Sequence, residues 1–235
     1  MSELFRLVEV QCADSAQAHS FTLSCGDRRV FELASLVEKE AMIDLVTGVE
    51  VAKHGRVQIV QGDRRLNKNN ELGKDGERRR QSQTIPVIWQ SLRKARQGRV
   101  AWVSANGGLI SNLKVWENVT LPLWHHFRHD EPEAEQRIKH WLALLGLEQN
   151  AFADFMASPP ASLALWQRKL AGLLRALVQM PQLLVIDAKV FEGVEAHLTE
   201  QWVAALDIYA EKDGAVLAIT DSLTSLPWQK VERLN

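Results

Sequence analysis

Residues 107–123, GGLISNLKVWENVTLPL, are the most informative stretch of this chain. They follow a predicted apolar strand at residues 99–104 and lead into a predicted helix at residues 115–127. Further strands are predicted at residues 4–10, 21–25, 29–33, 56–60, 183–187 and 215–220, and further helices at 35–48, 85–96, 132–145, 167–179 and 198–211. Strands that alternate with helices, with continuous apolar strands late in the chain, predict an α/β fold.

The composition limits the function classes that are open to the chain. With 235 residues and 46% hydrophobic content, it suits one large domain or a core with a subdomain. A net charge of -1 gives no general attraction to nucleic acid or anionic lipid. Cys12 and Cys25 lack metal-ligand spacing and indicate a reducing compartment. The start lacks a signal-peptide core, and no apolar run approaches the roughly 18 residues of a membrane span. We therefore expect a cytosolic chain that reaches a membrane only through a partner.

Two charged or polar clusters have a functional and a structural interpretation. The polar run at residues 67–83 contains Arg78, Arg79 and Arg80, which suit either phosphate or lipid head groups or, the interpretation we favour, a solvated loop. His125 and His129 share a helix face at metal-binding spacing, but no carboxylate completes an obvious site. We expect ordinary histidines and no metal. The acids at residues 130–135 are interpreted as favourable charges at the start of the next helix.

The stretch at residues 107–123 resembles the segment that follows the glutamine loop in ATP-binding cassette (ABC) ATPases. The similarity extends over residues 4–225 in the order of strands, helices and glycines. It implies a P-loop NTPase-like ABC nucleotide-binding domain, with a RecA-like core and antiparallel β-subdomain at residues 1–106 and 167–235 and a helical subdomain at residues 107–166. The form SNLKVWENVTLPL is most similar to the ATPases of Mce-type lipid transporters.

The resemblance assigns the phosphate loop, GxxxxGK[ST], to residues 33–40. Its glycines let backbone N–H groups surround phosphates, its lysine reaches the β and γ oxygens, and its hydroxyl holds magnesium. Here Leu33 and Glu38 stand at the two glycines, Lys39 keeps the lysine, and Glu40 replaces the hydroxyl. Two carboxylates would thus stand where phosphates sit, and like charges about 4 Å apart repel by about 4 kcal/mol at an effective dielectric constant of 20. For Lys39 we favour a helix residue paired with a glutamate over a phosphate ligand.

The other nucleotide contacts implied by the resemblance are mostly absent as well. The glutamine of the glutamine loop falls at Ala105, and the signature LSGGQ falls at residues 163–167, LALWQ, where only its leucine and Gln167 match. We expect Trp166 to be a packing residue. The second phosphate motif keeps Asp187, which could hold a water-bridged magnesium, but Ala188 replaces the catalytic glutamate that activates water. The D-loop aspartate falls near Val194, and Asp221 replaces the switch histidine.

Together these residues predict a pseudo-ATPase cassette that docks on an integral membrane permease, as a homodimer or with another cassette, at the inner face of the inner membrane. The docking surface is expected near Leu109, Ile110, Leu113 and Trp116, with Trp116 either an anchor or subdomain core. No nucleic-acid partner is expected, and ATP or magnesium would bind weakly at most. Two alternatives remain open: an ATPase that uses Lys39 and Asp187 in an altered geometry, and a soluble regulator that has borrowed the fold.

Overall fold

Two β-sheets and two layers of helices build the molecule in the computed structural model, which describes residues 3–12, 17–60, 89–91, 98–126, 131–221 and 232–234. The strands are β1 (Glu3–Gln11), β2 (Ala18–Ser24), β3 (Arg28–Glu32), β4 (Arg56–Val60), β5 (Trp89–Ser91), β6 (Val100–Val103), β7 (Leu183–Asp187), β8 (Ala215–Thr220) and β9 (Glu232–Leu234). The α-helices are α1 (Leu36–Thr47), α4 (Val115–His126), α5 (Glu131–Leu144), α6 (Phe152–Ala157), α7 (Leu165–Val178) and α8 (Ala196–Asp213). Short 3-10 helices are η1 (Gln149–Ala151), η2 (Pro160–Ser162) and η3 (Ala188–Phe191).

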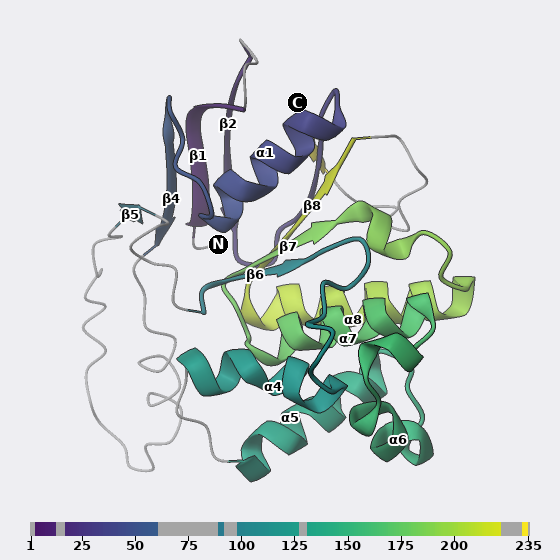
Figure 1. The fold of residues 1–235 in the computed structure, drawn as a ribbon. Coiled ribbons are helices and arrows are strands. Elements are labelled where there is room, and N and C mark those ends of the chain that lie inside the picture. The colour runs from purple at the N-terminus through teal and green to yellow at the C-terminus, as the bar shows by residue number, and fades with distance from the viewer. Residues whose placement is uncertain are drawn as a thin grey trace, which may run out of the picture.

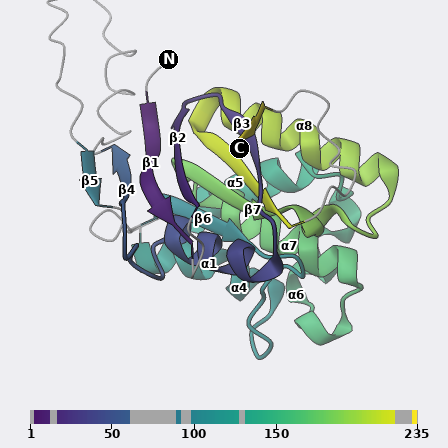
Figure 2. The same cartoon turned by 90° about the horizontal axis from the view of Figure 1, so that it is seen from above.

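The strands separate into an antiparallel and a parallel sheet. The antiparallel sheet has the order β2-β1-β4-β5, and the parallel sheet has the order β6-β7-β8-β3-β9. The parallel sheet is the central layer: α1 and the antiparallel sheet lie on one side of it, and α4 to α8 lie on the other (Figure 1, Figure 2). The α/β class predicted from the sequence is confirmed.

The side chains of β7 point alternately to the two faces of the parallel sheet, so one strand packs into two apolar clusters. All five of its residues are buried. Leu183 and Val185 belong to the apolar cluster under α1 and β1, whereas Leu184 and Ile186 belong to the cluster formed with α4 to α8. Because successive side chains of a strand point to opposite faces, a continuous apolar run fills two cores at once.

Local signals fix most element ends where the sequence predicts them. Ser35 caps α1 by accepting a hydrogen bond from the Glu38 N–H at 3.2 Å, and Gly48 ends it in the left-handed conformation. The predicted helix at residues 85–96 is wrong, because Trp89–Ser91 forms β5 and pairs antiparallel with β4. An open strand edge offers backbone hydrogen bonds that outweigh a weak helical pattern. Residues 67–83, including the arginine run, lie outside the described residues, and α6 and β9 were not predicted.

The turn at residues 104–114 is held against α7 and α4 by two side chains. Arg175 of α7 donates from Nη1 to the Gly108 carbonyl at 2.9 Å and from Nη2 to the Gly107 carbonyl at 3.3 Å. Asn118 of α4 is 1% exposed. It accepts from the Ile110 N–H at 2.7 Å and donates from Nδ2 to the carbonyls of Ile110, Leu113 and Lys114. The turn is therefore tied to both helices by hydrogen bonds.

The predicted boundaries of a helical subdomain at residues 107–166 stay a prediction. Its helices α4, α5 and α6 share one apolar cluster with α7, α8 and a face of the parallel sheet. Ile138, Trp141 and Leu142 of α5 and Leu145 just after it are all buried in that cluster.

Gly172→Ala tests the close approach of α7 to this turn. A Cβ at residue 172 would overlap the carbonyl oxygen and Cα of Gly107. Helix propensity alone predicts that alanine stabilises the protein by about 1 kcal/mol, whereas overlap predicts a loss of about 1–3 kcal/mol. Urea unfolding distinguishes the two by sign, and Ala204→Gly on the exposed side of α8 calibrates propensity. A more stable Gly172→Ala would contradict the packing.

Candidate functional site

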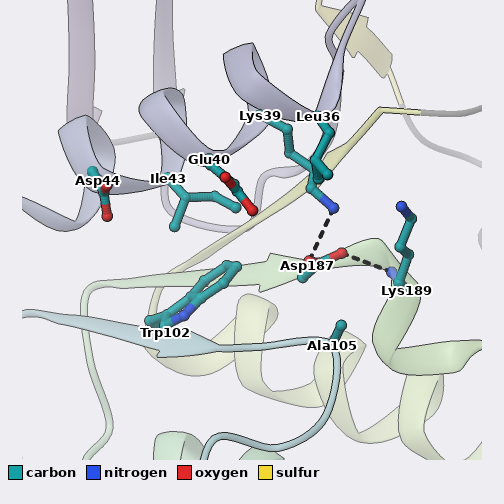
Figure 3. Close-up of a pocket in the computed structure, with 9 residues that line it drawn as sticks. All are labelled: Leu36, Lys39, Glu40, Ile43, Asp44, Trp102, Ala105, Asp187 and Lys189. Carbon is teal, nitrogen blue, oxygen red and sulfur yellow. Dashed lines mark hydrogen bonds and ion pairs between the residues drawn. The ribbon is translucent and has the colours of Figure 1, made fainter.

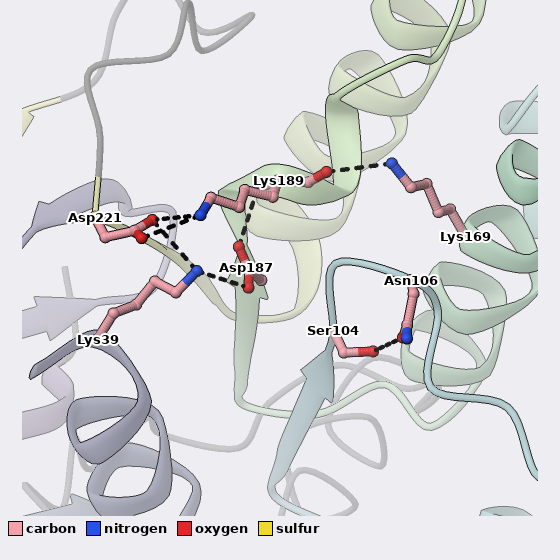
Figure 4. A network of polar contacts seen from close by, with 7 residues as sticks. All are labelled: Lys39, Ser104, Asn106, Lys169, Asp187, Lys189 and Asp221. Atoms are coloured by element: carbon pink, nitrogen blue, oxygen red, sulfur yellow. Dashed lines mark hydrogen bonds and ion pairs between the residues drawn. The ribbon is translucent and has the colours of Figure 1, made fainter. Parts of the chain in front are cut away.

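A buried lysine lies at the centre of the site. Lys39 is in the first turns of α1 and is 2% exposed. Its Nζ donates to Asp187 Oδ2 at 3.1 Å and lies 3.4 Å from Asp221 Oδ1 (Figure 4). The sequence-based prediction of a glutamate partner is wrong, because α1 packs over the carboxyl ends of β7 and β8, which bring two aspartates to the lysine.

Parallel strand ends assemble the two acids. Asp187 is the last residue of β7 and Asp221 directly follows β8, and these strands are neighbours in the sheet. The carboxyl edge of a parallel sheet is where such folds collect ligand-binding groups. Here the groups bind one another instead of pointing into open space.

Lys189 completes an alternating row of charges. Its Nζ lies 3.0 Å from both carboxylate oxygens of Asp221, and its backbone N–H donates to Asp187 Oδ1 at 3.0 Å. The row Asp187, Lys39, Asp221, Lys189 therefore contains two cations and two anions. A buried charge is tolerated only when it is paired and hydrogen-bonded, and this row meets both conditions for Lys39.

The pairing changes the pKa values of two members of the row. Burial acts to raise the pKa of Asp221, but hydrogen bonds from Lys189 and from its own backbone, with the charge of Lys39, outweigh burial and lower it. The hydrogen bond to Asp221 raises the pKa of Lys189, although burial opposes the change. Both shifts favour the charged forms at neutral pH.

Three backbone N–H groups around the start of α1, those of Ala34, Glu38 and Lys39, have acceptors within the chain. Only residues 33–35 separate β3 from α1, so residues 36–40 of the assigned phosphate loop are helical. The Ala34 N–H donates to Glu38 Oε2 at 3.1 Å, and the Lys39 N–H donates to the Ser35 carbonyl at 3.0 Å. The carboxylate of Glu38 thus binds backbone at a helix N-terminus, where negative charge is favourable.

A cavity of about 500 Å³ lies between α1 and the ends of β6 and β7. Its lining residues, labelled in Figure 3, are Leu36, Lys39, Glu40, Ile43, Asp44, Trp102, Ala105, Asp187 and Lys189. Glu40 and Ala105, two positions singled out in the sequence, therefore face the same space as Lys39 and Asp187. Trp102 and Lys189 were missed as lining residues, because only the packing of α1 over β6 and β7 brings them there.

The signature positions form the start of α7. Gln167 Oε1 accepts from the Ala164 N–H at 2.9 Å, which caps the helix. Trp166 packs against the large apolar cluster, so its predicted packing role is confirmed. Ala188 is 3% exposed within η3, and Val194 packs against the same cluster.

Lys169 is a second buried lysine that sequence analysis missed. It lies 3% exposed in α7 and donates from Nζ to the carbonyls of Lys189 and Glu192, at 3.2 and 2.6 Å. Burial lowers its pKa. The lysine satisfies carbonyls at the end of η3 and so fixes the segment that carries Lys189.

The predicted docking residues differ in exposure. Leu109 and Trp116 are half-buried against the large apolar cluster, Leu113 is half-buried, and Ile110 is 41% exposed. Ile110 is thus the member best placed to meet another molecule.

The described part of the chain offers neither a metal site nor a membrane span. There, no three His, Cys, Asp or Glu side chains are placed to hold a metal ion, and no helix has the length and apolarity needed to cross a membrane. His129 lies outside the described residues. Glu133 and Glu135 pair with Arg137 and Lys139 one helical turn along α5.

No protein-family model matches the chain. Over 149 residues, it is 30% identical to "Methionine import ATP-binding protein MetN 1" of Acinetobacter baylyi, which covers 63% of the chain and 34% of the relative. The chain is a homologue of ABC transporter ATP-binding cassettes. Another relative is "Probable ribonucleotide transport ATP-binding protein mkl" of Mycobacterium bovis, 29% identical over 50% of the chain and 32% of that protein. The cassette homologue thus spans about a third of the length of these curated relatives.

Solved structures of other proteins identify the fold. An ATP-binding subunit of an ABC transporter superimposes with a TM-score of 0.70 at 16% identity, over 94% of this chain and 80% of that one. The cassette MJ0796, solved as a dimer bound to ADP and Pi, gives 0.68 at 17% identity, over 99% and 94%. The fold is that of an ABC ATPase, α/β with an antiparallel β-subdomain beside the parallel core sheet, as the resemblance implied.

Asp221→Asn tests the row of charges through pH. We expect the variant to lose about 3 kcal/mol of unfolding free energy at pH 7, because Lys39 and Lys189 lose an anion. The folded-state pKa of Asp221 lies below its ordinary value of 3.8. Its carboxylate therefore contributes stability that is fully present above pH 3.8 and is lost as pH falls through the folded-state pKa. The difference between parent and variant should narrow below pH 3.8 in urea titrations.

The control is Asp207→Asn, which removes a more exposed partner of Arg28 at 2.6 Å. It should cost about 1 kcal/mol or less. Equal losses for the two variants at pH 7 would contradict a special role for the buried row.

Proposed function

We propose that the chain is a non-catalytic cassette subunit, a pseudo-ATPase that docks on an integral membrane permease. The observation that carries the proposal is the pairing of Lys39 with Asp187 and Asp221, which occupies the groups that an ATPase would turn toward phosphate and magnesium. The chain would act as a fixed support under the permease or as the partner of another cassette. Its place would be the cytoplasmic face of the inner membrane.

Binding of a phosphate at Lys39 would require the lysine to leave its aspartates. Removal of one partner from a buried ion pair costs about 3–5 kcal/mol, which corresponds to a weakening of binding by two to four orders of magnitude. The phosphate would also approach Glu40, whose carboxylate faces the cavity, and Asp221. Electrostatics therefore oppose nucleotide even where space exists.

Hydrolysis lacks its general base in this arrangement. Ala188 and Ala105 carry no group that could orient or deprotonate water at the positions implied for the glutamate and glutamine. At the signature position, Trp166 packs into the apolar cluster and Gln167 caps its own helix. A partner cassette would receive no serine or glycine pair from this chain, so both composite sites of such a dimer would be impaired.

The transport role rests on the relatives and on the sequence resemblance. One similar solved structure, cbiO1 from Clostridium perfringens, is described as part of the ABC transporter complex cbiONQ, with a TM-score of 0.66 at 15% identity. The curated relatives carry methionine and ribonucleotide transport in their names. For this chain, the similarity of residues 111–123 to Mce-type ATPases supports lipid as the transported class.

An altered nucleotide site is the second candidate function. The cavity of about 500 Å³ with two lysines in its lining favours it. Such an enzyme would need Lys39 and Asp187 to separate when magnesium-ATP binds. The third alternative, a soluble regulator, would not co-purify with a membrane protein.

We expect no saturable binding of magnesium-ATP below millimolar concentration, and no hydrolysis above blank, because both lysines of the site are already paired with aspartates. Isothermal titration calorimetry measures the binding. A micromolar dissociation constant would overturn the proposal. Weak binding that Lys39→Ala abolishes, and that the exposed control Lys53→Ala leaves intact, would favour the altered site.

Ala188→Glu alone should not restore ATP hydrolysis, because the lost catalytic residues of such a site act as a unit. The melting curve of this variant must first show that the buried position accepts a glutamate.

Ile110 should mark the docking surface. A photoreactive phenylalanine analogue at residue 110, expressed in cells, is expected to cross-link to a polytopic membrane protein that mass spectrometry identifies. The same analogue at Val51, which is 61% exposed after α1, is the control. Cross-links to soluble proteins alone would support the regulator, and equal membrane cross-links from both positions would contradict a surface centred on Ile110.

A further inference from the structure

The cavity beside α1 is chemically different at its two ends. Figure 3 shows Lys39, Lys189 and Asp187 at one end, and Asp44 and Trp102 toward the other. At the lysine end, each ammonium group is already bound to an aspartate. An anionic ligand would find no cation there that is free of a carboxylate.

The opposite end has an excess of negative charge. Glu40 and Asp44 lie one turn apart on α1, so both point from the same face of the helix. Both line the cavity, and neither has an ion-pair partner among the residues that the structure describes. Glu40 is exposed and Asp44 is half-buried, so a ligand can reach both carboxylates from solvent.

An aromatic and aliphatic surface lies next to these carboxylates. Trp102 of β6 is half-buried and lines the cavity opposite α1, while Ile43 and Leu36 add apolar contacts from the helix. The face of a tryptophan ring attracts a cation within about 6 Å, more strongly where water is excluded. An indole is not a metal ligand, so this lining suits an organic cation better than a hydrated divalent ion.

We propose that this end of the cavity binds an organic cation of the guanidinium class, stacked on Trp102 and hydrogen-bonded to Glu40 and Asp44. A guanidinium is planar, weakly hydrated and rich in donors, so it can stack on a ring while it donates to carboxylates at its edge. An aliphatic stem would lie against Ile43 and Leu36. The cation needs no movement of Lys39, which distinguishes it from nucleotide.

Two sources carry this chemistry: a free small molecule and an arginine side chain of a partner protein. The probes are therefore n-butylguanidinium and N-acetyl-arginine N-methylamide, with N-butylurea as a neutral ligand of the same shape. Two-dimensional NMR of 15N-tryptophan-labelled protein follows the indole N–H of Trp102, assigned by its loss in Trp102→Phe. This readout does not depend on nucleotide or on a permease, so it can fail or succeed independently of the proposed function.

Both cations should shift the Trp102 resonance saturably, with a dissociation constant on the order of 1 mM for ligands this small. N-Butylurea should give no saturable shift. Glu40→Gln and Asp44→Asn should each weaken binding about fivefold and about 25-fold together. Glu50→Gln, which removes an exposed acid beyond α1 that does not line the cavity, should leave affinity unchanged.

A peptide analogue that binds at least about tenfold more tightly than butylguanidinium would identify a protein side chain as the source, and equal affinities would identify a free cation. The proposal is overturned if neither cation shifts Trp102 saturably, if butylurea binds as well as butylguanidinium, or if the double variant, folded by its NMR spectrum, binds like the parent.

Discussion

Lys39 holds a positive charge at a place that is 2% exposed, and the arrangement of the surrounding elements depends on the need to neutralise it. Two carboxylates lie close to the ammonium group, and among the described residues both come from the ends of β7 and β8. Asp221 also pairs with Lys189. Lys169 donates hydrogen bonds to carbonyls of the segment that carries Lys189. The site therefore behaves as one electrostatic unit rather than as separate motif positions.

The charge row and the helix start together account for the proposed loss of ATPase chemistry. Glu38 satisfies the backbone N–H of Ala34, so the helix end has an anion of its own. Lys39 is paired with Asp187 and Asp221, so its ammonium group is also satisfied within the chain. Lys39 and the Ala34 N–H, both within the assigned phosphate loop, thus have partners inside the chain.

Sequence reasoning succeeded where signals were local. The helix predicted at residues 35–48 and the buried strand predicted at residues 183–187 lie as expected, because caps and apolar patterns act within a few residues. It failed where partners are distant. Lys39 and Asp187 are 148 positions apart, and their pairing depends on which strands are neighbours in the sheet. The same limit explains β5, whose three residues become a strand only because β4 offers an open edge.

The stretch at residues 107–123 links the fold to the proposed docking role. Arg175 and Asn118 hold its first turn, and Gly172 allows the backbone of Gly107 to approach α7. This turn connects β6, next to the charged cavity, with α4 and the exposed side chain of Ile110. A connection fixed by these hydrogen bonds is consistent with the proposed role of the chain as a fixed support under a permease.

The most direct test of the central claim is an experimental structure of the protein soaked in a high concentration of a non-hydrolysable magnesium-ATP analogue. The account predicts that Lys39 Nζ stays on Asp187 and Asp221, with no phosphate at the start of α1. Density for a phosphate bound to Lys39, with the lysine released from both aspartates, would contradict it.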